Sequence, residues 1–81
     1  MTITVKLFAA MRDLTGGDSA EVELPDGATV ADLRRELGRQ LPLARTLLLR
    51  SAVAINHDVV ENDRPLQAAD EVAVIPPVSG G

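Results

Sequence analysis

One segment of the 81-residue chain carries a complete set of helix signals, and a single amphipathic helix limits the folds open to the rest. Thr29 and Asp32 have the spacing of a capping box, in which each side chain satisfies a free backbone N–H at the helix start. An apolar stripe follows at helical spacing, and Pro42 ends it because proline cannot continue a helix. The stripe consists of Val30, Leu33, Leu37 and Leu41. This helix has one side to bury, so the remaining chain must supply the surface that it covers.

Elsewhere apolar residues alternate with polar ones, which is the period of a strand with one buried face. Two such segments, 2–8 and 19–24, are close in sequence and predict an antiparallel hairpin. Shorter strands are expected over 51–55, 59–60 and 71–75. The connections are expected to be a helical turn over 9–14, turns over 25–27 and 56–58, a helical or extended piece over 43–50 and a polar stretch over 61–70.

Two strands, one helix and three further strands make the pattern of an α+β domain. We therefore predict a mixed sheet of four to five strands with one main helix packed on one face. A chain of 81 residues forms one domain. Residues 1–75 are expected to be its globular part, and residues 76–81 a flexible C-terminal tail.

The composition excludes several kinds of chemistry. The chain has no cysteine, so disulfides, thiolate nucleophiles and cysteine-based metal sites are ruled out. The one histidine, His57, lacks a second His or Cys beside it and is interpreted as a solvated turn residue, so no metal is expected. A net charge of −4 without a basic-aromatic patch argues against nucleic acid.

Neither a membrane span nor a secretion signal is expected. No apolar run approaches the ~20 residues that cross a bilayer, and Lys6 interrupts the first apolar stretch. A cytoplasmic protein is the simplest interpretation. Other charged residues are interpreted as solvated: Arg34 and Arg35 on the outer helix face, and Asp63, Asp70 and Glu71 as surface acids, of which the last two could meet a basic partner.

The tail Pro76-Pro77-Val78-Ser79-Gly80-Gly81 has no evident role in the fold. Two glycines weaken regular structure, but their bare backbone can enter a channel too narrow for other residues. The two prolines lack N–H groups, cannot extend a sheet and favour an extended backbone. We therefore expect the carboxylate of Gly81 to be the reactive group, presented at the end of the tail. The alternative is an ordinary frayed terminus.

A carboxylate must be activated before it reacts. As an acyl-adenylate it can be attacked by a sulfur or nitrogen nucleophile, and sulfur attack can yield a terminal thiocarboxylate, which is a good sulfur donor. We expect a separate activating enzyme to supply the adenylation and a second partner to receive the product.

A docking surface is expected beside the tail. Phe8 lies on the polar face of the first strand. In the last strand Ile75 shares a face with Glu71, and the charge of Glu71 indicates that this face is solvated. If these two strands are parallel neighbours, the two apolar side chains meet near the start of the tail. The alternative is that they are scattered surface residues, which are common.

Two stretches of the sequence resemble a known family. Leu7-Phe8-Ala9-Ala10-Met11-Arg12-Asp13-Leu14-Thr15-Gly16 and the ending Asp70-Glu71-Val72-Ala73-Val74-Ile75-Pro76-Pro77-Val78-Ser79-Gly80-Gly81 are similar to those of the small, sulfur-carrying subunit of molybdopterin synthase. The specific part is the pair of prolines before the terminal glycines. Ala69 and His57 depart from the family pattern, at turn positions.

The resemblance implies a β-grasp, ubiquitin-like fold and a subunit that is not itself an enzyme. Gly81 would be adenylated by an activating enzyme that uses ATP and then become a thiocarboxylate. The tail, Pro76, Pro77, Val78, Ser79 and Gly80, would insert into the large catalytic subunit, within a heterotetramer, where Gly81 would donate sulfur to a cyclic pyranopterin monophosphate. Phe8, Val59 and Ile75 match the docking surface of the family. No tightly bound cofactor is implied.

Three other functions remain open at this point. The related sulfur carrier of thiazole synthesis shares the fold and the Gly-Gly end, although Arg12 to Gly16 and Pro76-Pro77 favour the molybdopterin branch. A ubiquitin-like modifier joined to lysines of other proteins is the second alternative, with Lys6 as the only lysine of the chain itself. The third is an interaction domain with an inert tail.

Overall fold

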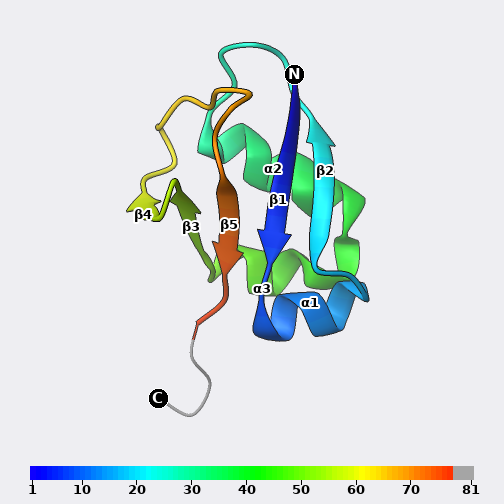
Figure 1. Cartoon of the computed structure of the whole chain (residues 1–81). Helices are drawn as coiled ribbons and strands as arrows, with labels where there is room; N and C mark the ends of the chain where they lie inside the picture. The colour runs from blue at the N-terminus through cyan, green and yellow to red at the C-terminus, as the bar shows by residue number, and fades with distance from the viewer. Residues whose placement is uncertain (78–81) are drawn as a thin grey trace.

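The computed structural model describes residues 1–77, which form a twisted sheet with helices against it (Figure 1). The elements in chain order are β1 (Thr2–Leu7), α1 (Ala9–Thr15), β2 (Ser19–Glu23), α2 (Val30–Gln40), the 3₁₀ turn η1 (Pro42–Ala44), α3 (Arg45–Leu49), β3 (Ala52–Ile55), β4 (Asp58–Val60) and β5 (Val72–Ile75). The predicted α+β class is therefore confirmed.

The strand order is β2-β1-β5-β3-β4, so the last strand of the chain lies at the centre of the sheet. β1 pairs with β5 in parallel, whereas the β1–β2, β3–β5 and β3–β4 pairs are antiparallel. This mixed five-stranded sheet with α2 packed on one face is the β-grasp, ubiquitin-like arrangement that the resemblance implied. The predicted hairpin of the first two strands is confirmed.

The main helix begins as the sequence predicts. The Thr29 hydroxyl accepts a hydrogen bond from the Asp32 N–H at 3.4 Å, and the Asp32 carboxylate accepts one from the Thr29 N–H at 2.9 Å. The backbone hydrogen bond from Thr29, followed by the bond from the Arg35 side chain, lowers the pKa of Asp32. The capping box is therefore complete, and it fixes where the apolar stripe of α2 meets the sheet.

The core lies between the sheet and α2, and it includes residues from segments that lacked a clear pattern. Met11 of α1, Leu48 of α3 and Leu66 of the long connection are all buried with the strands. Burying a side chain of this size stabilises a fold by roughly 1.5–3 kcal/mol. Two small residues of connecting segments, Ala28 and Ala44, are buried as well. The predicted strand and helix positions make up the rest: Ile3, Val5, Leu7, Val22, Leu24, Val30, Leu33, Leu37, Val53, Ile55, Val72 and Val74.

Several boundaries differ from the prediction. β1 ends at Leu7 because Phe8 is the N-cap of α1, where the Met11 N–H donates to its carbonyl. β3 starts one residue later than predicted because Ser51 closes α3, its hydroxyl donating to the Leu47 carbonyl at 2.7 Å. The ambiguous segment 43–50 is helical, split into η1 and α3, each too short to show a helical period in the sequence.

Arg34 is not the freely solvated residue that the sequence suggested. Its guanidinium donates to the Asn62 side chain and to the Leu48 carbonyl, both at 2.8 Å. Burial lowers the pKa of Arg34. This side chain therefore ties α2 to α3 and to the connection that follows β4.

Replacing Gly38 with alanine should stabilise the fold. Gly38 lies inside α2, and an added Cβ would meet the Arg45 Cγ at 3.7 Å and a Leu48 methyl at 3.8 Å, both ordinary contacts. Because glycine disfavours a helix interior, Gly38→Ala should raise the free energy of unfolding by about 0.5–1 kcal/mol in urea titrations. Gly27→Ala is the control and should destabilise, since Gly27 has φ +86°. Destabilisation by Gly38→Ala would contradict this packing.

Candidate functional site

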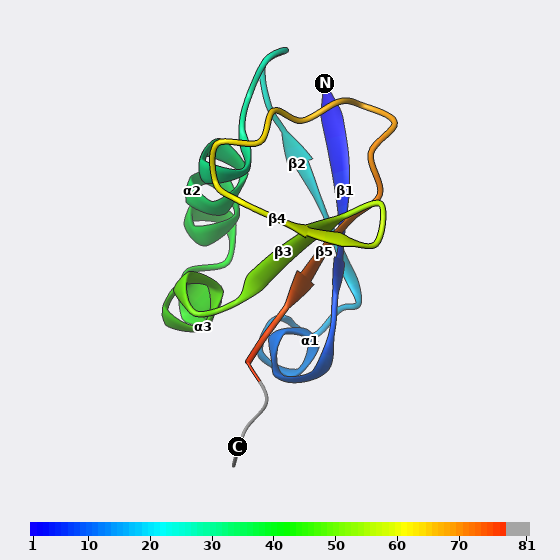
Figure 2. The same ribbon diagram turned by 90° about the vertical axis from the view of Figure 1, so that its left-hand side faces the viewer.

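One face of the sheet carries no long helix. Figure 2 shows α2 and α3 together on one side of the strands, which leaves the other side of β1, β5, β3 and β4 uncovered by either. We call this surface the open face, made of Lys6, Phe8, Ala54, His57, Val59, Glu71, Ala73 and Ile75. It is shallow and hollowed, with a volume of about 270 Å³.

The strand register explains the hollow. Lys6, Ala73, Ala54 and Val59 are successive partners across β1, β5, β3 and β4, so they form one row on the open face. The two central members of the row are alanines, which fill little of the space above the sheet. The hollow therefore follows from small residues on the two inner strands between larger ones on the flanking strands.

The three apolar residues of the expected docking surface lie around this hollow. Leu7 and Val74 are register partners, so Phe8 and Ile75 leave neighbouring parallel strands at the same level. Val59 lines the hollow from β4 and is 70% exposed. The parallel pairing and the exposure of Phe8 and Ile75 are as predicted, and the roles of these residues in docking stay a prediction.

Polar residues that sequence reasoning did not assign to the site complete the rim. Lys6 lies at one end of the row, and His57 and Glu71 lie at the start of β5, where Nε2 of His57 is 3.4 Å from the Glu71 carboxylate. His57 is a solvated turn residue, as expected. The signal that could have found Lys6 is its place between Val5 and Leu7, which puts it on the same face as the other members of the row.

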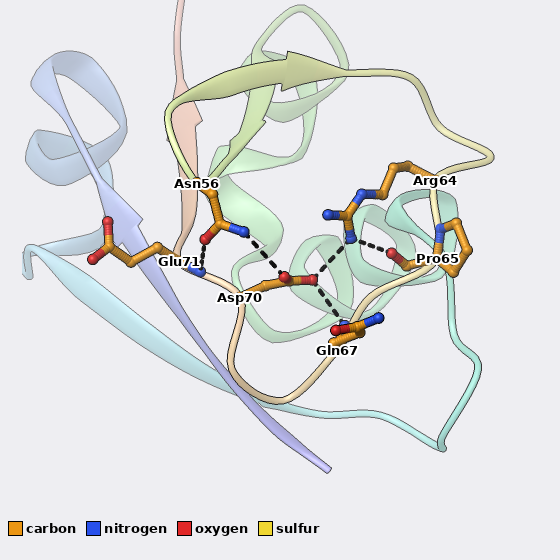
Figure 3. A network of polar contacts seen from close by, with 6 residues as sticks. All are labelled: Asn56, Arg64, Pro65, Gln67, Asp70 and Glu71. Carbon is orange, nitrogen blue, oxygen red and sulfur yellow. Dashed lines mark hydrogen bonds and ion pairs between the residues drawn. The ribbon is translucent and has the colours of Figure 1, made fainter.

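A buried carboxylate fixes this edge of the site. The Asp70 side chain is only 7% exposed, so its interpretation as a surface acid was wrong. Figure 3 shows it between three partners: Arg64 donates at 2.9 Å, the Gln67 N–H at 2.8 Å and the Asn56 side chain at 3.3 Å. Arg64 also donates to the Pro65 carbonyl. This set of bonds is the Asp70 network.

The Asp70 network connects the β3–β4 turn to the beginning of β5. Asn56 accepts from the Glu71 N–H at 2.9 Å while it donates to Asp70, so one amide bridges both segments. Asn56 and His57 have φ values of 53° and 75°, the left-handed region that asparagine tolerates best. The network therefore holds His57 and Val59 in place beside β5.

Burial and the polar partners of Asp70 have opposite effects on the pKa of its carboxyl. Burial raises the pKa of its carboxyl, but the hydrogen bonds from Gln67 and Arg64, the charge of Arg64 and the bond from Asn56 together lower it below its usual value. The ionised form is therefore favoured in the folded state.

The tail begins at the edge of the open face. β5 ends at Ile75, the predicted end of the globular part, yet Pro76 is still buried and only Pro77 is exposed. The chain is therefore packed against the fold through Pro76. The expected reactive segment Val78, Ser79, Gly80 and Gly81 lies outside the described residues.

Residues 1–77 contain no cluster of three or more metal-ligating side chains. The helices of this part of the chain are all too short or too polar to cross a bilayer.

Almost the entire chain matches one known protein family. The model described as the ThiS family matches residues 5–81, which spans the open face and the entire tail. The chain belongs to the ThiS family.

Individual relatives agree with this assignment to the ThiS family. The molybdopterin synthase sulfur carrier subunit of Escherichia coli K12 is 42% identical over 84 residues, covering 98% of this chain and 99% of that protein. The crystal structure of SAMP1 from Haloferax volcanii covers both chains fully, with a TM-score of 0.88 and 27% identity. A complex of subunits 1 and 2 of molybdopterin-converting factor from Helicobacter pylori includes a chain of the same fold, with a TM-score of 0.71, 22% identity and full coverage of both chains.

Replacing Asp70 should weaken the fold and reduce its response to acid. The folded-state pKa of Asp70 is lowered, so its stabilising effect is present at neutral pH and is lost as pH falls through the folded-state pKa. Asp70→Asn should therefore lower the free energy of unfolding by about 1–3 kcal/mol near pH 7. The difference in stability between neutral and acidic buffer should also shrink, as measured by urea titrations at both values.

Asp18→Asn is the matched control, because Asp18 is exposed in the loop before β2. It should leave the stability close to that of the parent protein. An Asp70→Asn protein as stable as the parent at neutral pH would contradict a structural role for the Asp70 network.

Proposed function

We propose that this chain is a sulfur carrier, the small subunit of a molybdopterin synthase. The observation that carries the proposal is that the ThiS-family match runs to Gly81 and so takes in the prolines and both terminal glycines. The Escherichia coli relative with that name is similar over almost the whole length of both chains. The function therefore concerns the domain and its tail together.

The proposed chemistry uses the carboxylate of Gly81. An activating enzyme transfers AMP from ATP to this carboxylate and releases pyrophosphate. Hydrosulfide then displaces AMP, and the product is a thiocarboxylate at Gly81. The sulfur of this thiocarboxylate forms a bond to a cyclic pyranopterin monophosphate, and water cleaves the acyl C–S bond, which returns the carboxylate of Gly81. In this scheme the chain donates sulfur and is not itself the enzyme. ATP is bound by the activating enzyme and not by the carrier.

The partner proposed for the open face is the large catalytic subunit, in a heterotetramer formed in the cytoplasm. Phe8, Val59 and Ile75 surround a hollow that would receive an apolar side chain of that subunit. The tail leaves the domain from the same edge, directly after Ile75. The paired subunits in the Helicobacter pylori structure support a partner of this kind. Docking on the open face would thus aim Pro77 and the glycines at the catalytic site.

The first test is the mass of the intact protein after incubation with its activating enzyme, ATP and a sulfur donor. The expected result is a mass increase equal to the exchange of one oxygen for one sulfur, because the thiocarboxylate replaces the carboxylate. A protein lacking Gly81 is the control and should keep its mass. An unchanged mass of the full chain, under conditions that convert the Escherichia coli relative, would contradict the proposal.

The second test concerns the open face. Phe8→Ala and Ile75→Ala should each weaken binding to the large subunit of molybdopterin synthase by about tenfold in calorimetric titrations, since each removes an apolar contact from the centre of the interface. Because both side chains are exposed in the isolated domain, unfolding free energies should change little. Leu43→Ala, on η1, is the control for loss of an exposed leucine. Equal weakening by this control would contradict docking on the open face.

A protein modifier joined through Gly81 to lysines is the second candidate function. It is favoured by the full-length similarity to SAMP1, the small archaeal modifier protein 1 of Haloferax volcanii, whose fold matches with a TM-score of 0.88. Lysine attack on the adenylate or on a derived thioester would give an isopeptide bond. Conjugates that disappear on deletion of Gly81, in cells where no thiocarboxylate forms, would support this function over sulfur transfer.

A further inference from the structure

A second hollow lies on the helical side of the molecule, between α2 and α3. Its volume is about 580 Å³, compared with about 270 Å³ for the open face, and the two hollows share no residue. Gly38 lies where the two helices meet, close to Leu48 and to the aliphatic part of Arg45. Apolar side-chain atoms therefore line the hollow where the two helices meet, and the rest of the hollow is open to solvent.

Positive charge is concentrated around this hollow. The segment from residue 30 to residue 50 holds five of the eight basic residues of the chain but only two of its twelve acidic ones. Four of these arginines line the hollow: Arg34, Arg35, Arg39 and Arg45. The two acids of the segment are already engaged, Asp32 with Arg35 and Glu36 with Arg39. Among residues 1–77, Arg45 takes part in no ion pair.

Apolar surface lies beside this charge. Leu49 lines the hollow and is 76% exposed. Within the described part of the chain, only Leu43 is a more exposed large apolar residue, at 83%. Exposed leucine next to cationic side chains and their hydrocarbon stems is a mixed surface that neither water nor a purely polar ligand covers well.

We propose that the hollow between α2 and α3 is a docking site for an acidic, leucine-bearing segment of a partner protein. The carboxylates of that segment pair with Arg45 and the neighbouring arginines, and its apolar side chains cover the exposed Leu49. Charge complementarity favours an acidic partner, because the local charge around this hollow is positive whereas the net charge of the molecule is negative.

The same surface is poorly suited to other polyanions. Nucleic acid binding without base pairing relies on aromatic side chains for stacking, and the one aromatic residue, Phe8, lies on the open face. An anionic membrane is an extended surface, so it would approach the acidic remainder of the molecule as well as the hollow. The net charge of −4 opposes that approach. A protein segment can instead insert one apolar side chain into the hollow while its carboxylates reach the arginines around it.

The position of the site gives it a role distinct from that of the open face. Because α2 and α3 lie on the other side of the sheet, a segment bound between them leaves Phe8, Ile75 and the start of the tail uncovered (Figure 2). One protein could thus hold the carrier while another acts on Gly81. This consequence rests on the proposed function, whereas the docking site itself does not.

The test is a titration of the ¹⁵N-labelled full chain with a synthetic peptide, followed by NMR. The peptide has about 16 residues, or roughly four helical turns, with leucines on one side and glutamates on the other. The control peptide carries glutamine in place of each glutamate. The expected result is that the acidic peptide shifts the amide signals of α2 and α3 and leaves those of β1 and β5 unchanged. Added salt should weaken binding.

Two pairs of variants assign the binding to this hollow. Arg45→Glu and Leu49→Ser should each weaken binding of the acidic peptide, Arg45→Glu by about tenfold because it replaces an attraction by a repulsion. Arg12→Glu makes the same charge change on α1, and Leu43→Ser removes a leucine of similar exposure outside the hollow. Both controls should bind like the parent. All four positions are exposed, and a spectrum of each free variant that matches the parent excludes misfolding.

Each other outcome overturns the proposal. No shift with the acidic peptide, or equal shifts with the glutamine peptide, would mean that charge does not select the ligand. Shifts on the open face, or weakening by the control variants, would place the binding elsewhere. Arg45-dependent binding of a single-stranded oligonucleotide or of phosphatidylserine vesicles, without binding of the peptide, would make the surface a general polyanion site. None of these readouts involves sulfur transfer, so the proposed function is tested separately.

Discussion

The parallel pairing of β1 with β5 is the contact on which the open face depends. It brings the first and last strands together at the centre of the sheet, although nearly the whole chain separates them in sequence. The same pairing sets Phe8 beside Ile75 and makes the tail start where β1 ends. A shift of one residue in this register would turn Val72 and Val74 out of the core. The register that buries Val72 and Val74 therefore also places Ile75 on the open face.

The two faces of the sheet serve different purposes. One is covered by α2 and α3, whose buried residues Val30, Leu33, Leu37 and Leu48 supply most of the helical part of the core. The other keeps small residues at its centre and receives its shape from the Asp70 network, which fixes the β3–β4 turn against β5. Because this network joins residues of the turn, the long connection and the start of β5, the rim of the open face is held by polar bonds rather than by the core.

Local signals made the class of fold predictable. The capping box, the apolar stripe of α2 and the alternation of the longer strands each act within a few residues, so the sequence displays them directly. The role of Asp70 could not be predicted in this way, because it depends on Asn56, 14 positions earlier in the chain, and on Arg64. The lining of the second hollow was hidden for a related reason: η1 and α3 are too short to show a helical period. The exposed pair Phe8 and Ile75 was predictable because each belongs to an alternating strand.

The place of β5 also has a mechanical consequence. A partner that draws the tail into a channel pulls β5 along its own length, and β5 is bonded on one side to β1 and on the other to β3. The hydrogen bonds of both ladders then lie across the direction of the force and are loaded together. They would otherwise break one after another, as they do when an edge strand is peeled away. The domain can thus act as a firm handle for whatever is carried at the end of its tail.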